Sequence, residues 1–234
     1  MELFCTVVGE VMWAHCLITR EVSTEDTLVT NLQFVLFDLG DVVCHFIQAR
    51  CLAAFAAATR LRAQDIQCKL WDSGFSQQCD AGRYSAAEMY TQICQRLGAS
   101  LPRCEVSRLW ALAFEPNAEV FAIAAALRRH LPTGLLTNNP PLLREAFPAC
   151  LPDMERYFDP IIFSYQYGAC KPSPALYEAV VRRTGVAAQA TLLIDDAQAN
   201  VRGAKTAGWQ AIHFTTPGAL REALRDLGVG GVGA

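Results

Sequence analysis

Four groups of polar side chains have the types and spacing that chemistry on an anionic substrate requires. Each stands at the end of a short apolar run or in a loop between such runs. The groups are Asp38, Thr137 with Asn138, Lys171, and Asp195 with Asp196. Carboxylates act as nucleophiles or bind divalent cations, whereas a lysine and a hydroxyl stabilise negative charge on a reacting group. Together these groups predict a single polar site.

Phosphoryl transfer is a chemistry that these residue types can support. The Asp38 carboxylate could attack phosphorus to form an aspartyl-phosphate, which divides one difficult displacement into two easier ones. Magnesium bound by carboxylates and phosphate oxygens would neutralise the charge between the two anions. Lys171 would add a fixed positive charge, and Thr137 would donate a hydrogen bond to a phosphoryl oxygen, with the Asn138 amide nearby.

Each of these residues, taken alone, also has a structural interpretation. A strand-end Asp such as Asp38 often caps a helix or forms a turn. The Asp195–Asp196 pair could cap the helix that follows it, and Thr137 could cap the helix that begins at a Pro-Pro pair. Lys171 could be a solvated loop lysine. The functional interpretation therefore rests on the four groups occurring together.

The elements that must position these groups are strands with helices between them. Short apolar runs predict strands over residues 34–40, 133–138, 160–164, 191–195 and 209–214. Helical patterns lie between and after the last four of these strands, over residues 140–147, 173–183, 197–208 and 217–228. Such alternation predicts an α/β fold with a parallel sheet covered on both faces. Ligands bind beyond the carboxyl ends of the strands in such sheets, which is where the polar groups stand.

A block without strands separates the first strand from the others. Helices are expected over residues 49–61, 85–98, 107–114 and 117–130. Ser85 and Glu88 form a capping-box pattern, and Gly98 marks the end of that helix. The sequence thus predicts an all-helical insertion after the first strand.

Composition narrows the class of protein. The 234 residues are 52% hydrophobic and 18% charged, with a formal net charge of −3, so no basic footprint for nucleic acid is present. Ten cysteines without a CxxC pair favour a reducing cytoplasm. The first thirty residues lack the features of a signal peptide, and their apolar stretches are too short to span a membrane. We expect a small polar ligand as the partner.

Five segments of the sequence resemble motifs of a known family. FDLGDVV, LLTNNP, YGACKPSPALYEAV and LLIDDAQANVRGAKTAGW, in this order, are similar to motifs of the haloacid dehalogenase (HAD) superfamily of hydrolases. With SGFSQQCDAGRYSAAEMY, they most resemble its sugar-phosphate phosphatases with a helical cap. The resemblance implies a Rossmann-like core over residues 32–46 and 117–234 and a cap over 47–116. The polar, linker-like segment STEDTLVTN separately predicts that residues 1–31 are an extension, partly disordered.

The resemblance also implies a role for each site residue. Asp38 would be the nucleophile of a Mg²⁺-dependent phosphatase, and Asp38, the Gly40 carbonyl and Asp196 would hold the ion. Asp195 would support this shell from behind or bind through water. Asn200 occupies the position where relatives carry a second acidic residue, although it could be purely structural. The expected substrate is a small phosphomonoester, most readily a sugar phosphate.

The sequence departs from the family pattern at Gly40. Most phosphatases of the superfamily carry there a second Asp, which protonates the leaving group and later activates water. Asp41 and His45 are weak replacements on position alone. A sugar 1-phosphate would need less protonation because its anomeric oxygen is comparatively acidic. A dehalogenase-type hydrolase would need none, but the Asp195–Asp196 pair disfavours that alternative.

Two further questions stay open at this level. The site could be a catalytically weakened remnant within a binding module. The sequence does not indicate the oligomeric state. The cap is expected to set specificity, and four residues between its first helices are candidates for gripping a sugar. These are Trp71, Phe75, Gln78 and Arg83. Trp71 and Phe75 fit the core of the cap equally well.

Overall fold

The computed structural model describes residues 31–229, and its centre is a parallel sheet. The strand order is β5-β4-β1-β6-β7, and every neighbouring pair runs parallel. The first strand of the chain is therefore the central one. The strands are β1 (Phe34–Phe37), β4 (Thr133–Thr137), β5 (Ile161–Phe163), β6 (Thr191–Asp195) and β7 (Gln210–His213).

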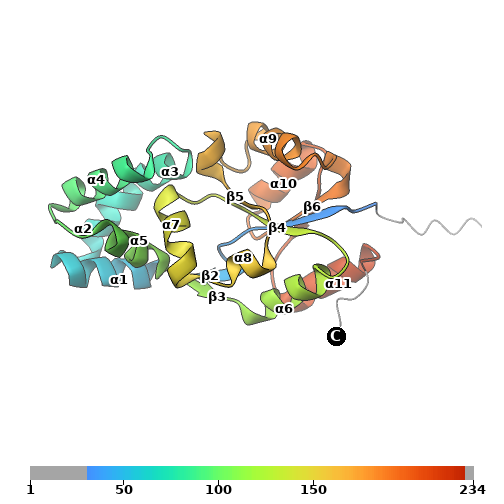
Figure 1. The fold of residues 1–234 in the computed structure, drawn as a ribbon, viewed down its shortest axis with the longest axis horizontal. Coiled ribbons are helices and arrows are strands. Elements are labelled where there is room, and N and C mark those ends of the chain that lie inside the picture. The colour runs from blue at the N-terminus through green and yellow to red at the C-terminus, as the bar shows by residue number, and fades with distance from the viewer. Residues whose placement is uncertain (1–30, 230–234) are drawn as a thin grey trace, which may run out of the picture.

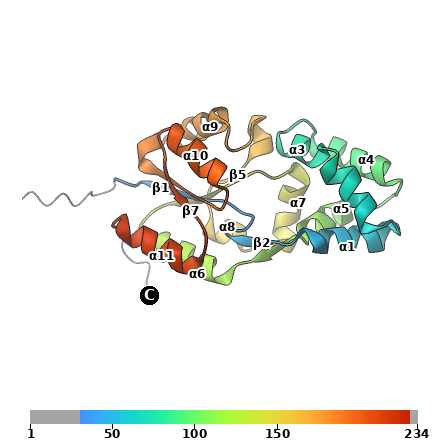
Figure 2. The same cartoon turned by 180° about the vertical axis from the view of Figure 1, so that it is seen from behind.

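Helices cover both faces of this sheet, which confirms the predicted α/β class. Figure 1 shows α9 and α10 on one face and α6 and α11 on the other, and the view from behind in Figure 2 agrees. The bounds are α6 (Ala118–Leu127), α7 (Pro141–Cys150), α8 (Met154–Tyr157), α9 (Pro174–Thr184), α10 (Gln198–Thr206) and α11 (Pro217–Asp226), with short 3₁₀ turns η2 (Ser164–Tyr167) and η3 (Ala188–Ala190).

Alternation along β1 explains why both faces must be covered. Phe34 and Leu36 belong to one apolar cluster, and Val35 and Phe37 belong to the other, because successive side chains of a strand point to opposite faces. All four residues are buried. A strand that is apolar on both sides is stable only between two layers of helices.

The block between the first strand and the rest is helical, as predicted. It stands beyond one end of the sheet in Figures 1 and 2, and we call it the cap. The Ser85–Glu88 capping box is present, and Gly98 ends the same helix in the left-handed conformation. The cap elements are α1 (Gln48–Thr59), α2 (Ala63–Gln67), the π-helical η1 (Cys68–Asp72), α3 (Phe75–Asp80), α4 (Ala86–Leu97) and α5 (Arg103–Ala111).

A two-stranded antiparallel ribbon joins the cap to the core, and the sequence did not predict it. It consists of β2 (Cys44–Phe46) and β3 (Phe114–Pro116). The predicted helix over 107–114 is wrong at both ends, since α5 begins four residues earlier and Phe114 already belongs to β3. The predicted domain boundaries, which fall where the two ribbon strands end, remain a prediction. The predicted extension falls almost wholly outside the described residues.

No helix within residues 31–229 combines the length and the apolar character needed to cross a bilayer. The eight cysteines in this part of the chain are all free thiols.

Gly134 in β4 is a position where the sheet has no room for a side chain. A Cβ atom there would lie 2.6 Å from the Pro160 carbonyl oxygen and 2.9 Å from the ring of Phe34. We therefore expect Gly134→Ala to lower the free energy of unfolding by about 1–3 kcal/mol, measured by urea denaturation. Gly218→Ala is the control, because the nearest atom to its Cβ would be 3.9 Å away. Equal midpoints for both variants would contradict this account.

Candidate active site

A buried lysine joins two of the predicted strand-end carboxylates. The Lys171 Nζ lies 2.8 Å from Asp38 Oδ1 and 2.6 Å from Asp195 Oδ2. It also donates a hydrogen bond of 2.8 Å to the Leu136 carbonyl oxygen. All three N–H donors of the ammonium group are thus used within the protein. Residues from three distant parts of the chain meet here because β1 lies between β4 and β6.

The burial of this cluster governs its protonation. Burial raises the pKa of Asp38 to about 7, against the opposing effect of the Lys171 charge and with a further increase from Asp195. For Lys171, burial alone would lower the pKa, but Asp38 and Asp195 outweigh it and the pKa lies above its ordinary value. Lys171 therefore stays a cation, while burial opposes ionisation of Asp38.

The loop that carries Lys171 is fixed to the end of β4 by a reciprocal amide pair. The Asn138 Nδ2 donates to the Lys171 carbonyl oxygen, and the Lys171 backbone N–H donates to Asn138 Oδ1, both at 2.9 Å. On the other side, a Cβ at Gly203 would lie 2.7 Å from Pro172, so α10 packs directly against this loop. The side chain of Asn138 is thus occupied in positioning Lys171.

Both oxygens of Asp195 already accept hydrogen bonds within the protein. Its Oδ2 accepts from Lys171, and its Oδ1 accepts from the Ala197 backbone N–H and from Asn200 Nδ2, each at 2.9 Å. Its side chain is fully buried. Asn200 is held in turn by Tyr177, whose hydroxyl donates to the Asn200 carbonyl oxygen at 2.9 Å. These contacts suit the supporting roles predicted for Asp195 and Asn200.

Three carboxylates converge at a point where a cation would fit. Asp38, Asp195 and Asp196 each offer an oxygen, and these atoms lie within 4.8 Å of one another. Burial, then Asp195 and Asp41, raise the pKa of Asp196. Because Asp195 is engaged elsewhere, Asp38 and Asp196 are the carboxylates free to bind an ion. Hard oxygen donors of this kind suit Mg²⁺.

A cavity of about 300 Å³ opens above these groups between the core and the cap. The Thr137 hydroxyl oxygen accepts a hydrogen bond of 2.6 Å from Asn139 Nδ2, which leaves its own proton available for a ligand. The cavity is lined by nearly all of the predicted site residues, while Asp195 lies behind it. Those in the lining are Asp38, Gly40, Thr137, Asn138, Lys171, Asp196 and Asn200.

The cap side of the cavity differs from the prediction. Trp71 lines it and stacks on Trp110, with ring centroids 4.9 Å apart. Phe75 is instead buried in the core of the cap, beneath the Arg96 guanidinium. Gln78 accepts a hydrogen bond from Tyr84, and neither it nor Arg83 is part of the lining.

Other residues of α3 face the cavity in their place, namely Ser76, Gln77 and Asp80. Three- and four-residue spacing puts Ser76 and Asp80 on one side of the helix, and this was the signal available in the sequence. The sequence did not show which side of this helix would face the cavity.

Asp41 and His45, the two weak candidates to replace an acid at position 40, lie in different surroundings. Asp41 lines the cavity, but its Oδ1 accepts the Phe46 backbone N–H at 3.0 Å. Its φ of 53° marks a turn conformation. His45 is an exposed residue of the ribbon and is not part of the lining. Neither observation favours a role in proton transfer.

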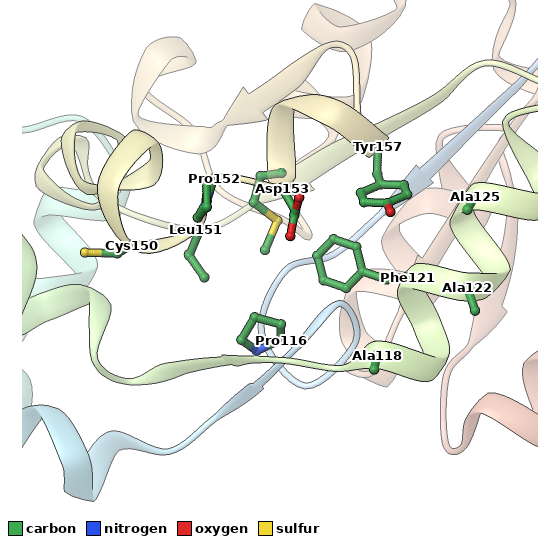
Figure 3. A pocket seen from close by; sticks show the side chains of 11 residues that line it. Pro116, Ala118, Phe121, Ala122, Ala125, Cys150, Leu151, Pro152, Asp153 and Tyr157 are labelled. Carbon is green, nitrogen blue, oxygen red and sulfur yellow. The ribbon is translucent and has the colours of Figure 1, made fainter.

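A second cavity, of about 380 Å³, lies away from these groups beside α6 and α8. Figure 3 shows Pro116, Phe121 and Leu151 around a common apolar space, with Tyr157 at its side. Of its lining residues only Asp153 carries a carboxylate. Among the described residues, the group of possible metal ligands lies at the first cavity and not here.

Comparison with known proteins agrees with this arrangement. A family model described as a haloacid dehalogenase-like hydrolase matches residues 33–208. The chain belongs to this family. The match includes all four groups of polar residues with which the sequence analysis began.

Two relatives of the chain are described as phosphatases. It is 26% identical over 184 residues to a D-ribitol-5-phosphate phosphatase of Bacteroides thetaiotaomicron, covering 75% of this chain and 88% of that protein. It is 28% identical over 205 residues to phosphatase MT3486 of Mycobacterium tuberculosis, covering 84% and 94%.

The fold is similar to that of a solved HAD family enzyme of Bacteroides thetaiotaomicron, crystallised with magnesium and inorganic phosphate. The TM-score is 0.65 at 22% identity, and the match covers 79% of this chain and 94% of that one. At this identity the likeness confirms the HAD fold.

Replacing Lys171 by an uncharged residue should destabilise the fold by an amount that depends on pH. Lys171→Met leaves the Asp38 and Asp195 carboxyl groups without their cation, which costs roughly 3–5 kcal/mol near neutral pH. Lys171 lowers the pKa of Asp38, so in the variant this pKa lies higher than in the natural chain. The folded variant therefore binds more protons than the folded natural chain at neutral and alkaline pH, and its stability relative to the natural chain falls as pH rises.

Denaturant unfolding at about pH 5 and about pH 8 would measure this effect. The variant should lose more stability relative to the natural chain at the higher pH. Lys205→Met, at an exposed position of α10, is the matched control and should unfold like the natural chain. A loss of equal size at both pH values would contradict the electrostatic explanation.

Proposed function

We propose that this chain is a Mg²⁺-dependent phosphatase that hydrolyses a small phosphomonoester, most readily a sugar phosphate, through an aspartyl-phosphate at Asp38. The observation that carries the proposal is the convergence of Asp38, Asp196 and the Asp38–Lys171–Asp195 cluster at one cavity. Relatives described as phosphatases support it. Ten cysteines without a CxxC pair, eight of them free thiols within residues 31–229, favour a cytoplasmic setting.

Each residue has a defined part in the proposed reaction. The Asp38 oxygen that does not face Lys171 attacks phosphorus and displaces the leaving oxygen. Lys171, fixed by Asp195 and Leu136, presents a positive charge that needs no rearrangement during the reaction. Thr137 donates its free proton to a phosphoryl oxygen. Asp38, Asp196 and the Gly40 carbonyl would hold Mg²⁺, which when bound neutralises charge on the phosphate.

The arrangement disfavours the dehalogenase alternative. Expulsion of a halide requires no divalent cation, whereas here Asp196 adds a second free carboxylate beside the nucleophile. Two neighbouring anions repel each other unless a cation lies between them. The site is therefore organised for an ion and an anionic substrate.

The central test is hydrolysis of p-nitrophenyl phosphate by the purified chain. We expect release of phosphate that requires Mg²⁺, stops on addition of EDTA and returns with excess Mg²⁺. Asp38→Asn removes the nucleophile and should reduce the rate to that without enzyme, while the fold persists because the amide is isosteric. Asp226→Asn, at an exposed carboxylate, is the control and should keep full activity. Metal-independent turnover, or an active Asp38→Asn variant, would refute the proposal.

The charge of the cavity predicts which phosphates are accepted. Its lining contains the carboxylates of Asp38, Asp41 and Asp196 and a single cation, Lys171, which is already paired. A second anionic group on the substrate would meet like charge, at a cost of several kcal/mol. The paired indoles of Trp71 and Trp110 offer an apolar face to an uncharged leaving group.

We therefore expect kcat/KM for glucose 1-phosphate and glucose 6-phosphate to exceed that for fructose 1,6-bisphosphate by at least about 100-fold. A panel of phosphorylated metabolites, assayed by phosphate release, would measure this preference and identify the preferred sugar. Preference for the bisphosphate would show that the cavity's acidic character does not select substrates.

A further inference from the structure

Hydrolysis of an alkyl phosphate requires a proton for the leaving oxygen, and the core of this chain offers no obvious donor. Gly40 has no side chain where most phosphatases of the family carry an acid. The Asp41 carboxylate accepts a backbone hydrogen bond within the ribbon. Asp38 and Asp196 are committed to the nucleophile and the metal. Among the carboxylates in the lining, this leaves Asp80, which comes from the cap.

Asp80 is a carboxyl group without a partner. Within residues 31–229, neither of its side-chain oxygens has a hydrogen bond or an ion pair, and the half-buried residue lines the cavity. Burial raises the pKa of Asp80 well above its ordinary value. An acid with a raised pKa that lines the cavity beside the predicted nucleophile is a candidate for proton transfer.

The core holds Asp80 in place although the residue belongs to the cap. The Ser164 hydroxyl of η2, just after β5, donates a hydrogen bond of 2.6 Å to the Asp80 carbonyl oxygen. Two residues later, a Cβ at Gly82 would lie 2.3 Å from the Tyr165 carbonyl oxygen, so only glycine permits this approach. These two contacts fix the end of α3 against the same sheet that carries Asp38.

We propose that Asp80 is the proton donor to the leaving oxygen, supplied by the cap in place of a residue at position 40. This inference rests on the proposed phosphatase function. When Asp38 attacks phosphorus and the bond from phosphorus to the leaving oxygen breaks, the Asp80 proton moves to that oxygen and the alcohol leaves. The Asp80 carboxylate then takes a proton from the water that attacks the aspartyl-phosphate. The bond between Asp38 and phosphorus breaks, inorganic phosphate leaves, and both carboxyl groups return to their starting states.

The test compares two substrates that have the same apolar ring but differ in their need for a proton. Nitrophenolate leaves p-nitrophenyl phosphate without protonation, whereas the alkoxide of benzyl phosphate requires it. With enzyme in excess over substrate and saturating Mg²⁺, Asp80→Asn should slow benzyl alcohol release about 10²- to 10⁴-fold. Nitrophenol release should change less than about threefold. Neither substrate carries hydroxyl groups, so loss of a sugar contact cannot produce this difference.

A pH profile gives a second readout. For the natural chain, benzyl alcohol release should fall as pH rises and Asp80 loses its proton, and this limb should be absent in Asp80→Asn. Asp41→Asn is the matched control, since it removes a carboxylate from the same cavity and should leave the ratio of the two release rates unchanged. Thermal unfolding of each variant verifies that the fold is retained.

The outcomes separate the two proposals. If the natural chain releases nitrophenol with Mg²⁺ but Asp80→Asn slows both substrates equally, or neither, the assignment of Asp80 is overturned and the phosphatase stands. If the natural chain releases neither product, the proposed function itself fails, and Asp80 has no reaction to serve.

Discussion

The interaction on which the site depends is the ion pair of Lys171 with two carboxylates inside the protein. Its ammonium group is fully buried, and so is the side chain of Asp195. A charge in such surroundings persists only if opposite charges and hydrogen bonds replace the lost water. Asp38 and Asp195 meet this requirement for Lys171, and Lys171 meets it for them. Lys171 is thus the counter-charge that the two carboxylates share.

This interaction also constrains the fold around it. The loop that carries Lys171 must reach the ends of β1, β4 and β6, which are neighbours only in the observed strand order. The Asn138 amide and the close approach of α10 at Gly203 hold that loop. Because the chain leaves β1 at its carboxyl end to form the cap and returns from there to the core, the insertion necessarily stands beside the site. Core chemistry and cap specificity thus share one edge of the sheet.

Sequence alone was sufficient for features that depend on local pattern. The runs FVLF, TGLLT and TLLID predicted buried strands, and their order placed Asp38, Thr137 and Asp195 at one edge. It was insufficient where tertiary contacts decide. The ribbon strands have three residues each and pair across the entire cap, so no local signal marks them. The side of α3 that faces the cavity is likewise set by packing, which is why Phe75 was a candidate and Asp80 was not.

Packing does not explain the missing side chain at position 40. A Cβ atom on Gly40 would lie 3.7 Å from the nearest side chain, Phe46, which is ordinary van der Waals contact. A Cβ atom therefore fits at position 40. In the proposed mechanism the acid comes from α3 instead, and the Ser164 hydroxyl of η2 holds the end of that helix against the core. One contact between the core and the cap thus positions the proposed proton donor in the same cavity as Asp38, so the seating of the cap and the delivery of the proton depend on the same hydrogen bond.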